Sequence, residues 1–454
     1  MHRSLDLPDA IQSAICVSDS EIIANYCHDW TGRVHGATDL LVRPRTHIEV
    51  AQLIRETRRQ QMQVQVQGGN TSLAGGSIPL NGEILLSTER LKQIVVEPNS
   101  MTATVGAGVT LEDLQREIAN HGLSFGVDIA SRGSATLGGM AATNAGGIHV
   151  LRYGSMADNV IAMTCVFGDG STIEPRQPLI KDATGPSLTR LLVGSEGIFG
   201  VITSVTLRLL ALPQQRVAAL TPLESIEEGV QISTQLRHLM PEVDAIEYLG
   251  PEAIALAPTN PPWNIADGGA LLVQALMDAA RFAEELSLLH LERQWILTDD
   301  TSRRQELWSW RERIPEWIAT VGSPLKLDLS VPITRIGDLY RQAMAVASLT
   351  GITCYCFGHL GDGNLHVNLV GNNNELTAAA QALYQATLEF GGSISAEHGV
   401  GTLKKEALRL MRSPEELARL AALIEVLNPR RVVNPNVMLD IAQGEAHDTS
   451  PGME

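Results

Sequence analysis

The fold is indicated first by the stretch Gln67-Gly68-Gly69-Asn70-Thr71-Ser72-Leu73-Ala74-Gly75-Gly76-Ser77. It follows residues 63–67, where polar and apolar side chains alternate as they do in a strand. Glycine lets backbone N–H groups approach an anion closely, so a glycine-rich loop after a strand suits a diphosphate. The same composition also occurs in simple tight turns. One loop of this kind does not separate the two interpretations.

A second glycine-rich region, residues 131–147, follows a predicted helix over residues 110–121. Both regions also contain Asn, Thr and Ser, and two such loops favour a cofactor cradle over two isolated turns. Neither is a common nucleotide motif. Gly106-Ala107-Gly108 lacks the third glycine of the dinucleotide fingerprint, and the chain has no Gly-Lys-Ser/Thr phosphate loop.

Histidines and a carboxylate concentrate in the second half. Residues 358–368 read Gly-His-Leu-Gly-Asp-Gly-Asn-Leu-His-Val-Asn, between predicted strands at residues 352–357 and 366–370. The glycine turn would bring His359 beside His366, and Glu397-His398 adds a carboxylate and a third imidazole. Two His and one Glu are suitable ligands for a divalent metal such as Zn²⁺. Loop histidines bonded to backbone carbonyls are the alternative.

Two further motifs concern catalysis and substrate binding. Residues 122–126, Gly-Leu-Ser-Phe-Gly, match the hydrolase nucleophile pattern, but that pattern needs a strand before Ser124 and here the helix comes first.

Arg311 and Lys326 would together suit a carboxylate. Arg311 lies on a predicted helix over residues 301–320, where an exposed salt bridge is the alternative, and spacing does not decide between the two.

Composition limits the classes of function. The chain has 454 residues, 34 Lys and Arg against 51 Asp and Glu, and a net charge of −17, which argues against a nucleic-acid partner. Its five cysteines form no disulfide framework, so we expect a cytoplasmic protein. No membrane span, signal or transit peptide is apparent, and peripheral attachment to a membrane stays open. Length and a change in composition near residue 212 predict more than one domain.

Several motifs together resemble one flavoprotein family, that of vanillyl-alcohol oxidase and p-cresol methylhydroxylase (PCMH). The resemblance to the FAD-binding half of that family lies in residues 67–77, 133–147, 151–154 and 194–197. The resemblance to the C-terminal half lies in residues 358–368, 395–401 and 434–435, and it is to the D-2-hydroxy-acid dehydrogenase branch of the family. That branch includes D-2-hydroxyglutarate dehydrogenase, flavin D-lactate dehydrogenase and the glycolate oxidase flavin subunit. The resemblance extends over roughly residues 38–440.

The resemblance implies an α+β fold. Residues 1–215 would form a two-part FAD-binding domain of the PCMH type, and residues 216–390 an α/β substrate domain with an antiparallel sheet. Residues 391–454 would return to the FAD domain and carry Glu397 and His398 into the active site.

The resemblance also implies roles for individual residues. FAD, bound non-covalently, would contact Gln67, Gly68, Gly69, Asn70, Thr71, Ser72, Gly75, Gly76, Ser77, Gly133, Ser134, Gly138, Gly139, Thr143, Asn144, Gly147, Glu196, Gly197, Ile202 and Asn434, with Glu196, Gly197 and Ile202 near its adenosine end. His359, His366 and Glu397 match metal ligands, with Zn²⁺ the expected ion, and His398 matches a general base. Arg311 and Lys326 match residues that hold the substrate carboxylate, and Asn364 and Asn434 match positions near the flavin and substrate.

The implied reaction is oxidation of a D-2-hydroxy acid to the 2-oxo acid by hydride transfer to flavin N5. D-2-Hydroxyglutarate is the first choice of substrate and D-lactate the next, although relatives acting on the former can carry a threonine where this chain has Pro315. Electrons would pass to an electron-transfer flavoprotein, a quinone or a cytochrome, and we expect a homodimer. The alternatives are an oxidase using O₂, a glycolate or D-lactate oxidase-type subunit of a larger complex, and a zinc hydrolase.

Overall fold

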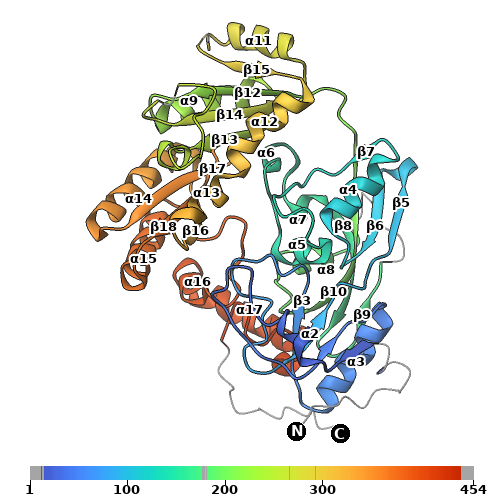
Figure 1. The fold of residues 1–454 in the computed structure, drawn as a ribbon. Coiled ribbons are helices and arrows are strands. Elements are labelled where there is room, and N and C mark those ends of the chain that lie inside the picture. Colours follow the sequence, from blue (N-terminus) through green and yellow to red (C-terminus); the bar gives the residue numbers. More distant parts are fainter. Residues whose placement is uncertain are drawn as a thin grey trace.

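The computed structural model describes residues 12, 15–175, 179, 181, 183–264, 266–291 and 293–440. Two lobes are visible in Figure 1, one built on two smaller sheets and the other on a single large sheet. Mixed helices and antiparallel sheets confirm the α+β class expected from the sequence. No helix among the described residues combines the length and the apolar character needed to cross a membrane.

The lobe built on the two smaller sheets holds both glycine-rich loops, and we call it the FAD lobe after the expected cofactor. Its first sheet has a glycine-rich loop at the end of a buried strand. In spatial order its strands are β1 (Cys16–Val17), β2 (Leu41–Val42), β4 (Ile84–Ser87) and β3 (Val64–Gln67). Helix α3 (His47–Arg59) begins with a capping box of Thr46 and Glu49 and packs its apolar face into the same core. Strand β3 is parallel to β4 and delivers the chain directly into residues 68–77.

The second sheet of this lobe is antiparallel and supports the other glycine-rich region. Its order is β5 (Ile94–Glu97), β6 (Thr102–Gly106), β10 (Gly200–Arg208), β8 (Val160–Phe167) and β9 (Thr172–Ile173). Its helices are α4 (Leu111–Ala119), α5 (Leu137–Thr143), α7 (Met156–Asn159) and α8 (Leu188–Leu192). Helix α6 (Val150–Tyr153) packs instead against the large sheet. Strand β7 (Leu123–Ser124) pairs with β11 (Leu210–Ala211), so Ser124 is not on a strand-to-helix turn and the hydrolase pattern is accidental.

The large sheet is antiparallel throughout. Its order is β15 (Ile296–Thr298), β12 (Val217–Pro222), β14 (Ala270–Ala275), β13 (Val243–Leu249), β17 (Thr353–His359), β18 (Asn364–Val370) and β16 (Leu325–Ser330). One face packs against α9 (Ile226–Leu239), α11 (Ala279–Leu288), α14 (Ile336–Thr350) and α15 (Asn373–Glu389). The other face packs against α10 (Pro251–Ile254), α12 (Thr301–Glu312) and α13 (Ile314–Val321).

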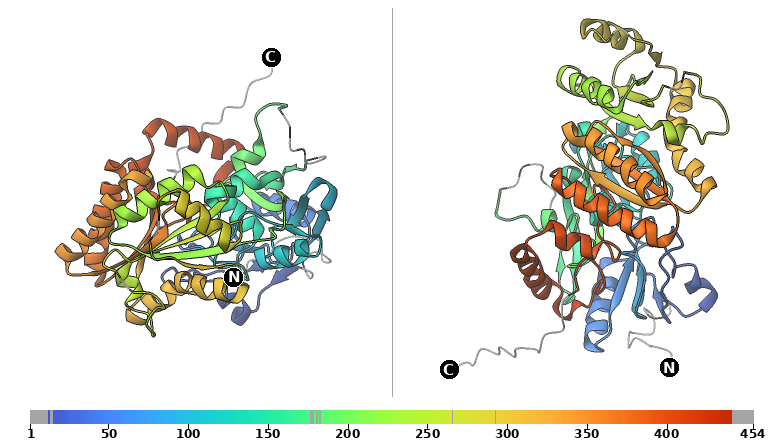
Figure 2. Two further views of the ribbon diagram at one scale, coloured as in Figure 1. Left: turned by 90° about the horizontal axis from the view of Figure 1, so that it is seen from above. Right: turned by 90° about the vertical axis from the view of Figure 1, so that its left-hand side faces the viewer.

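The C-terminal segment crosses back to the FAD lobe. Helices α16 (Lys405–Met411) and α17 (Pro414–Leu427) lie beside that lobe in Figures 1 and 2, and Leu408 and Ile424 are buried in its core. Asn428 is fully buried, and its side-chain amide donates to the carbonyls of Ile198 and Val433 at 2.8 and 2.7 Å. The segment between the two lobes, residues 391–404, therefore passes between the large sheet and the glycine-rich loops. The boundaries at residues 215 and 390 stay predictions.

Candidate active site

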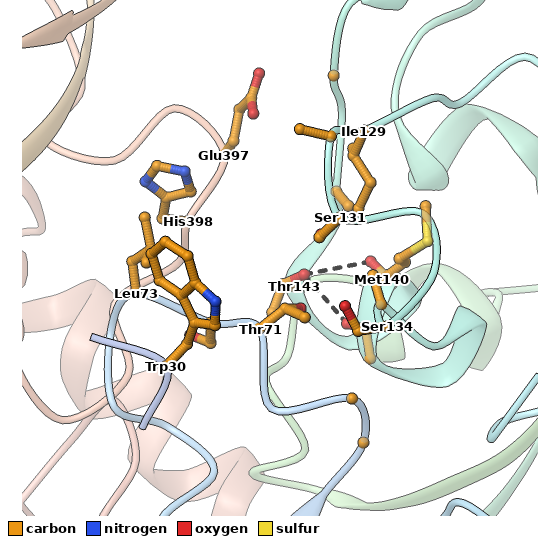
Figure 3. A pocket seen from close by; sticks show the side chains of 18 of the residues that line it. Trp30, Thr71, Leu73, Ile129, Ser131, Ser134, Met140, Thr143, Glu397 and His398 are labelled. Atoms are coloured by element: carbon orange, nitrogen blue, oxygen red, sulfur yellow. Dashed lines mark hydrogen bonds between the residues drawn. The ribbon is translucent and has the colours of Figure 1, made fainter. Parts of the chain in front are cut away.

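A cavity of about 620 Å³ lies where the glycine-rich loops, the large sheet and the C-terminal segment meet. In Figure 3, Glu397 and His398 face Ile129 and Ser131 across it, with Trp30 below His398. Its walls thus combine both predicted cofactor loops with the predicted catalytic residues. Segments far apart in the sequence contribute to one site.

The two glycine-rich loops touch backbone to backbone, which explains their composition. A Cβ on Gly69 would overlap the carbonyl oxygen of Ser134, and one on Gly138 would overlap Ala107. The Thr136 hydroxyl is buried beside Gly68 and has no hydrogen-bond partner among the described residues. Glycine-rich backbone that an anion can approach closely, next to an unpaired buried hydroxyl, fits the polar diphosphate of FAD. The loops are therefore a cradle and not merely turns.

Most residues predicted to contact FAD line this cavity. They are Gly68, Gly69, Asn70, Thr71, Ser72, Gly76, Ser77, Ser134, Gly138, Gly139, Thr143, Gly147, Glu196, Gly197, Ile202 and Asn434. Gln67, Gly75, Gly133 and Asn144 do not line it. The Gln67 amide instead donates to the carbonyls of Tyr26 and Ser77, and Asn144 accepts a hydrogen bond from the N–H of Ala157. These two side chains hold the loops in shape.

Glu196 connects the FAD lobe to the C-terminal segment. Its carboxylate accepts hydrogen bonds from the N–H groups of Val400 and Gly401, both at 2.7 Å. Burial raises the pKa of Glu196, while these two hydrogen bonds oppose the rise. The Asn434 amide donates to the Glu196 carbonyl at 2.9 Å. The place of Glu196 near adenosine stays a prediction, but its carboxylate is engaged in fixing the loop that carries His398.

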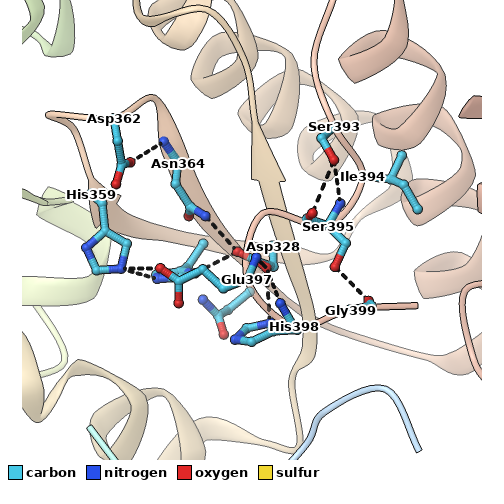
Figure 4. A network of polar contacts seen from close by, with 12 residues as sticks. Asp328, His359, Asp362, Asn364, Ser393, Ile394, Ser395, Glu397, His398 and Gly399 are labelled. Atoms are coloured by element: carbon cyan, nitrogen blue, oxygen red, sulfur yellow. Dashed lines mark hydrogen bonds and ion pairs between the residues drawn. The ribbon is translucent and has the colours of Figure 1, made fainter. Parts of the chain in front are cut away.

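The glycine turn between β17 and β18 brings the two histidines together as expected. His359 and His366 approach with Nε2 to Nε2 at 3.4 Å, and His359 Nε2 lies 3.0 Å from Glu397 Oε1. Figure 4 shows His359 and Glu397 pointing toward each other from separate segments. The contacts of His359 and His366 are therefore with side chains, and the interpretation as loop histidines bonded to backbone carbonyls is wrong.

Asp328 is the carboxylate around which this cluster is arranged. It lies on β16, is fully buried, and accepts hydrogen bonds from the N–H groups of Glu397 at 2.7 Å and His398 at 3.1 Å. The Nδ1 atoms of His366 and His398 each lie 3.4 Å from it. Burial alone would raise the pKa of Asp328, but attraction to His398 and a hydrogen bond from His366 hold it well below its ordinary value.

Arg311 is a cavity residue and not part of an exposed helix face. Its side chain is 10% exposed, its Nε donates to Glu247 Oε2 at 2.6 Å, and its guanidinium lies 4.7 Å from the centre of the Phe357 ring. The exposed salt bridge considered from the sequence is therefore wrong. Because Glu247 engages Nε, the remaining N–H groups of Arg311 stay available on the cavity wall.

Lys326 lies near the start of β16 and lines the cavity together with Arg311. Its Nζ lies 4.7 Å from the centre of the Trp30 ring, and among the described residues no carboxylate forms an ion pair with it. Burial, followed by repulsion from Arg33, lowers the pKa of Lys326. A cation without an acidic partner in a cavity is suited to an anionic ligand.

Asn364 is placed differently from what we expected. It does not line the cavity; its side-chain amide donates to Asp328 Oδ1 at 2.9 Å. Asn368, two residues beyond His366 on the same face of β18, lines the cavity instead. Strand periodicity from His366 would have identified it. Trp30 was also missed, because a tryptophan in an N-terminal loop carries no signal of its distant partner.

The family resemblance also implies a metal ion held by His359, His366 and Glu397. Within the part of the chain that the structure describes, no group of three or more His, Cys, Asp or Glu side chains is arranged, as it stands, to hold a metal ion. His359, His366 and Glu397 nevertheless lie close to one another.

Comparison with known families agrees with this site. Residues 38–175 match the family described as FAD binding domain, and residues 212–438 match FAD linked oxidases, C-terminal domain. The chain belongs to the FAD-linked oxidases. This member of the family is accordingly an FAD-binding oxidoreductase, and the expectation of FAD as cofactor is confirmed.

Similar proteins support the assignment over nearly the whole chain. D-2-hydroxyglutarate dehydrogenase, mitochondrial, of Bos taurus is 34% identical over 93% of this chain and 81% of its own length. D-2-hydroxyglutarate dehydrogenase of Xanthomonas citri is 32% identical over 98% of both chains. A solved structure of alkyldihydroxyacetonephosphate synthase has a TM-score of 0.73 at 17% identity, covering 93% of this chain and 82% of its own, which shows a shared fold.

Replacing Gly69 tests the cradle. Gly69→Ala should weaken FAD binding by about tenfold or more, because relieving overlap with Ser134 costs roughly 1–3 kcal/mol. The measurement is flavin absorbance per chain after dialysis. Gly351→Ala is the control. At φ +71° an alanine is strained there too, but nothing lies close to its Cβ and the position is outside the cavity, so FAD content should not change. Full flavin content in Gly69→Ala would contradict the cradle.

Proposed function

We propose that this FAD-linked oxidoreductase oxidises a D-2-hydroxy acid to the corresponding 2-oxo acid. The observation that carries the proposal is the composition of one cavity wall, where His398, Arg311 and Lys326 stand beside the glycine-rich cradle. A base, a guanidinium and an ammonium are what a hydroxy-carboxylate needs, and FAD bound in the cradle would lie in the same cavity. When bound, FAD supplies the acceptor for the hydride at N5.

In this proposal the substrate carboxylate is bound by Arg311 and Lys326. Arg311 offers a planar pair of N–H donors, and its Nε is already held by Glu247. Lys326 adds a point charge from a different element, held against Trp30. The two cations come from α12 and β16, so a carboxylate between them would be fixed in both position and orientation.

His398 is proposed as the base that removes the hydroxyl proton. Burial lowers the pKa of His398, which favours the neutral imidazole that a base must be before it accepts a proton. Asp328 lies 3.4 Å from Nδ1, so it orients the ring and stabilises the imidazolium after transfer, leaving Nε2 for the substrate. The hydrogen bond from the His398 N–H to Asp328 fixes the backbone at the same point.

A divalent metal, with Zn²⁺ our first choice, belongs to the proposal as well. His359 Nε2 lies 3.4 Å from His366 Nε2 and 3.0 Å from Glu397 Oε1, and imidazole with carboxylate is a donor set that zinc accepts. These three residues would hold the ion. Bound there, it would act as a Lewis acid that lowers the pKa of the substrate hydroxyl. His359 Nδ1 is directed at Glu247, as ligand histidines commonly are toward a carboxylate.

D-2-Hydroxyglutarate is the proposed substrate and D-lactate the second candidate. The first choice rests on relatives that carry the name D-2-hydroxyglutarate dehydrogenase. The second is favoured by Pro315, which lines the cavity near Arg311. Proline provides neither a hydroxyl nor an N–H for a second carboxylate, so a substrate with one carboxylate would suit this wall.

Membership of the FAD-linked oxidases narrows the range of reactions. A zinc hydrolase is set aside because the chain is an FAD-linked oxidoreductase. A glycolate or D-lactate oxidase-type subunit of a larger complex, and an oxidase using O₂, remain open because they perform the same oxidation. The electron acceptor, a homodimer and the cytoplasmic location stay predictions from the sequence.

A substrate screen under anaerobic conditions tests the reaction. The D isomers of 2-hydroxyglutarate and lactate should bleach the bound flavin, while the L isomers should not, and the 2-oxo acid should form in equal amount. The measurement is flavin absorbance with product analysis, and peroxide formation on admitting air identifies an oxidase. His398→Ala is the companion variant: it should keep its flavin and bleach about 100-fold more slowly or worse. Absence of bleaching by every 2-hydroxy acid would overturn the proposal.

Removing divalent metal tests the ion independently. Exhaustive chelation should leave the FAD content unchanged and abolish flavin reduction, because the hydroxyl would keep the high pKa of an alcohol. Adding back Zn²⁺ or another divalent ion should restore the rate. Elemental analysis of the purified protein gives the ion and its stoichiometry. Full activity in demonstrably metal-free protein would remove the metal from the account.

A further inference from the structure

Glu247 is a buried carboxylate that takes no direct part in the proposed reaction but contacts two residues of the proposed site. It lies on β13 in the middle of the large sheet and is fully buried. On the neighbouring strand its register partner is His359. An ionised carboxylate is costly to bury, so its partners must explain why it is there.

Those partners are two cavity residues from different elements. Glu247 Oε1 lies 2.6 Å from Nδ1 of His359 on β17, and Glu247 Oε2 lies 2.6 Å from Nε of Arg311 on α12. Burial would raise the pKa of Glu247, but attraction to His359 and Arg311 lowers it to about 2. One carboxylate thus has each oxygen committed to a different residue of the proposed site.

The geometry divides the site into two ends joined by this carboxylate. His359 presents its other nitrogen, Nε2, to His366 and Glu397, where the ion is proposed. Arg311 has the Phe357 ring at 4.7 Å as its other described contact. Without Glu247 the guanidinium could turn about its long side chain, and the His359 ring would lose the partner that sets its orientation.

We propose that Glu247 is a positioning residue that sets the distance between the metal end and the carboxylate end of the substrate site. It does so by holding His359 and Arg311 with its two oxygens from one rigid strand. The inference rests on the proposed function, since it assigns Glu247 a part in that same site. A purely structural ion pair would instead stabilise the fold without affecting either ligand.

The test is Glu247→Gln. Glutamine keeps the shape of the side chain but has one acceptor oxygen, whereas His359 and Arg311 each need one. FAD content should stay at the wild-type level. The KM for the D-2-hydroxy acid that bleaches the wild type fastest should rise about tenfold or more, because a hydrogen bond between charged groups is lost. Affinity for Zn²⁺, measured by competition with a chelator, should fall about 10–100-fold.

Glu252→Gln is the matched control. Glu252 is a partly buried carboxylate on α10 that accepts a hydrogen bond from Tyr340 at 2.7 Å and does not line the cavity. The Glu252→Gln variant should have lower thermal stability but an unchanged KM and an unchanged affinity for zinc. If Glu247→Gln behaves in the same way, Glu247 is structural and the inference is overturned.

A double-mutant cycle gives a second readout that does not depend on the metal. If Glu247 acts through Arg311, the rise in KM caused by Arg311→Lys should be several-fold smaller in the Glu247→Gln background than in the wild type. Strictly additive effects would overturn the inference. Failure of the wild type to bleach with any 2-hydroxy acid, or to bind Zn²⁺, would instead count against the proposed function, so the two failures are distinguishable.

Discussion

The buried carboxylate of Asp328 is the constraint on which the arrangement of the site depends. A charge in the middle of a protein is tolerated only where hydrogen bonds and opposite charge surround it. Here the surroundings are the backbone of Glu397 and His398, the amide of Asn364 and two imidazoles. The C-terminal segment must therefore return alongside β16, where Ser395 and Ser393 bridge to Asp328 and Ser330.

From the other side, the FAD lobe fixes the same segment. Glu196 binds the N–H groups of Val400 and Gly401, and the N–H of Thr402 donates to the carbonyl of Ala74 at 2.8 Å. The loop that carries Glu397 and His398 is thus anchored to both lobes within a few residues. Neither lobe alone could set the distance between the flavin cradle and the histidines, so the site exists only where both anchors are made.

The sequence predicted the parts of the site whose signals are local. The glycine-rich loops follow a strand and a helix as expected, and the turn at residues 361–363 brings His359 to His366. The α+β class and the return of the C-terminal segment were implied by the family resemblance, and the structure has both features. Individual FAD and metal contacts were proposed from resemblance, and Gln67 and Asn144 prove to brace the loops instead.

Asp328 and Glu247 could not be found in this way. Asp328 lies in a strand whose alternating pattern predicts the strand but not the partner of its polar residue. Glu247 lies in a strand that is buried along its whole length and lacks this alternation. Asp328 meets His398 seventy positions later, and Glu247 meets His359 across a strand pair formed only by the complete sheet. Asn364 was misassigned for the same reason, because its neighbour Asp328 comes from another strand.

The most direct measurement is the rate of flavin reduction in Asp328→Asn, mixed anaerobically with the 2-hydroxy acid that reduces the wild type fastest. Asparagine keeps the shape but removes the charge and presents an N–H₂ group to donors. If Asp328 sets the loop and orients His398, reduction should slow by about 100-fold or more while the FAD content stays unchanged. A rate within about twofold of the wild type would contradict the account.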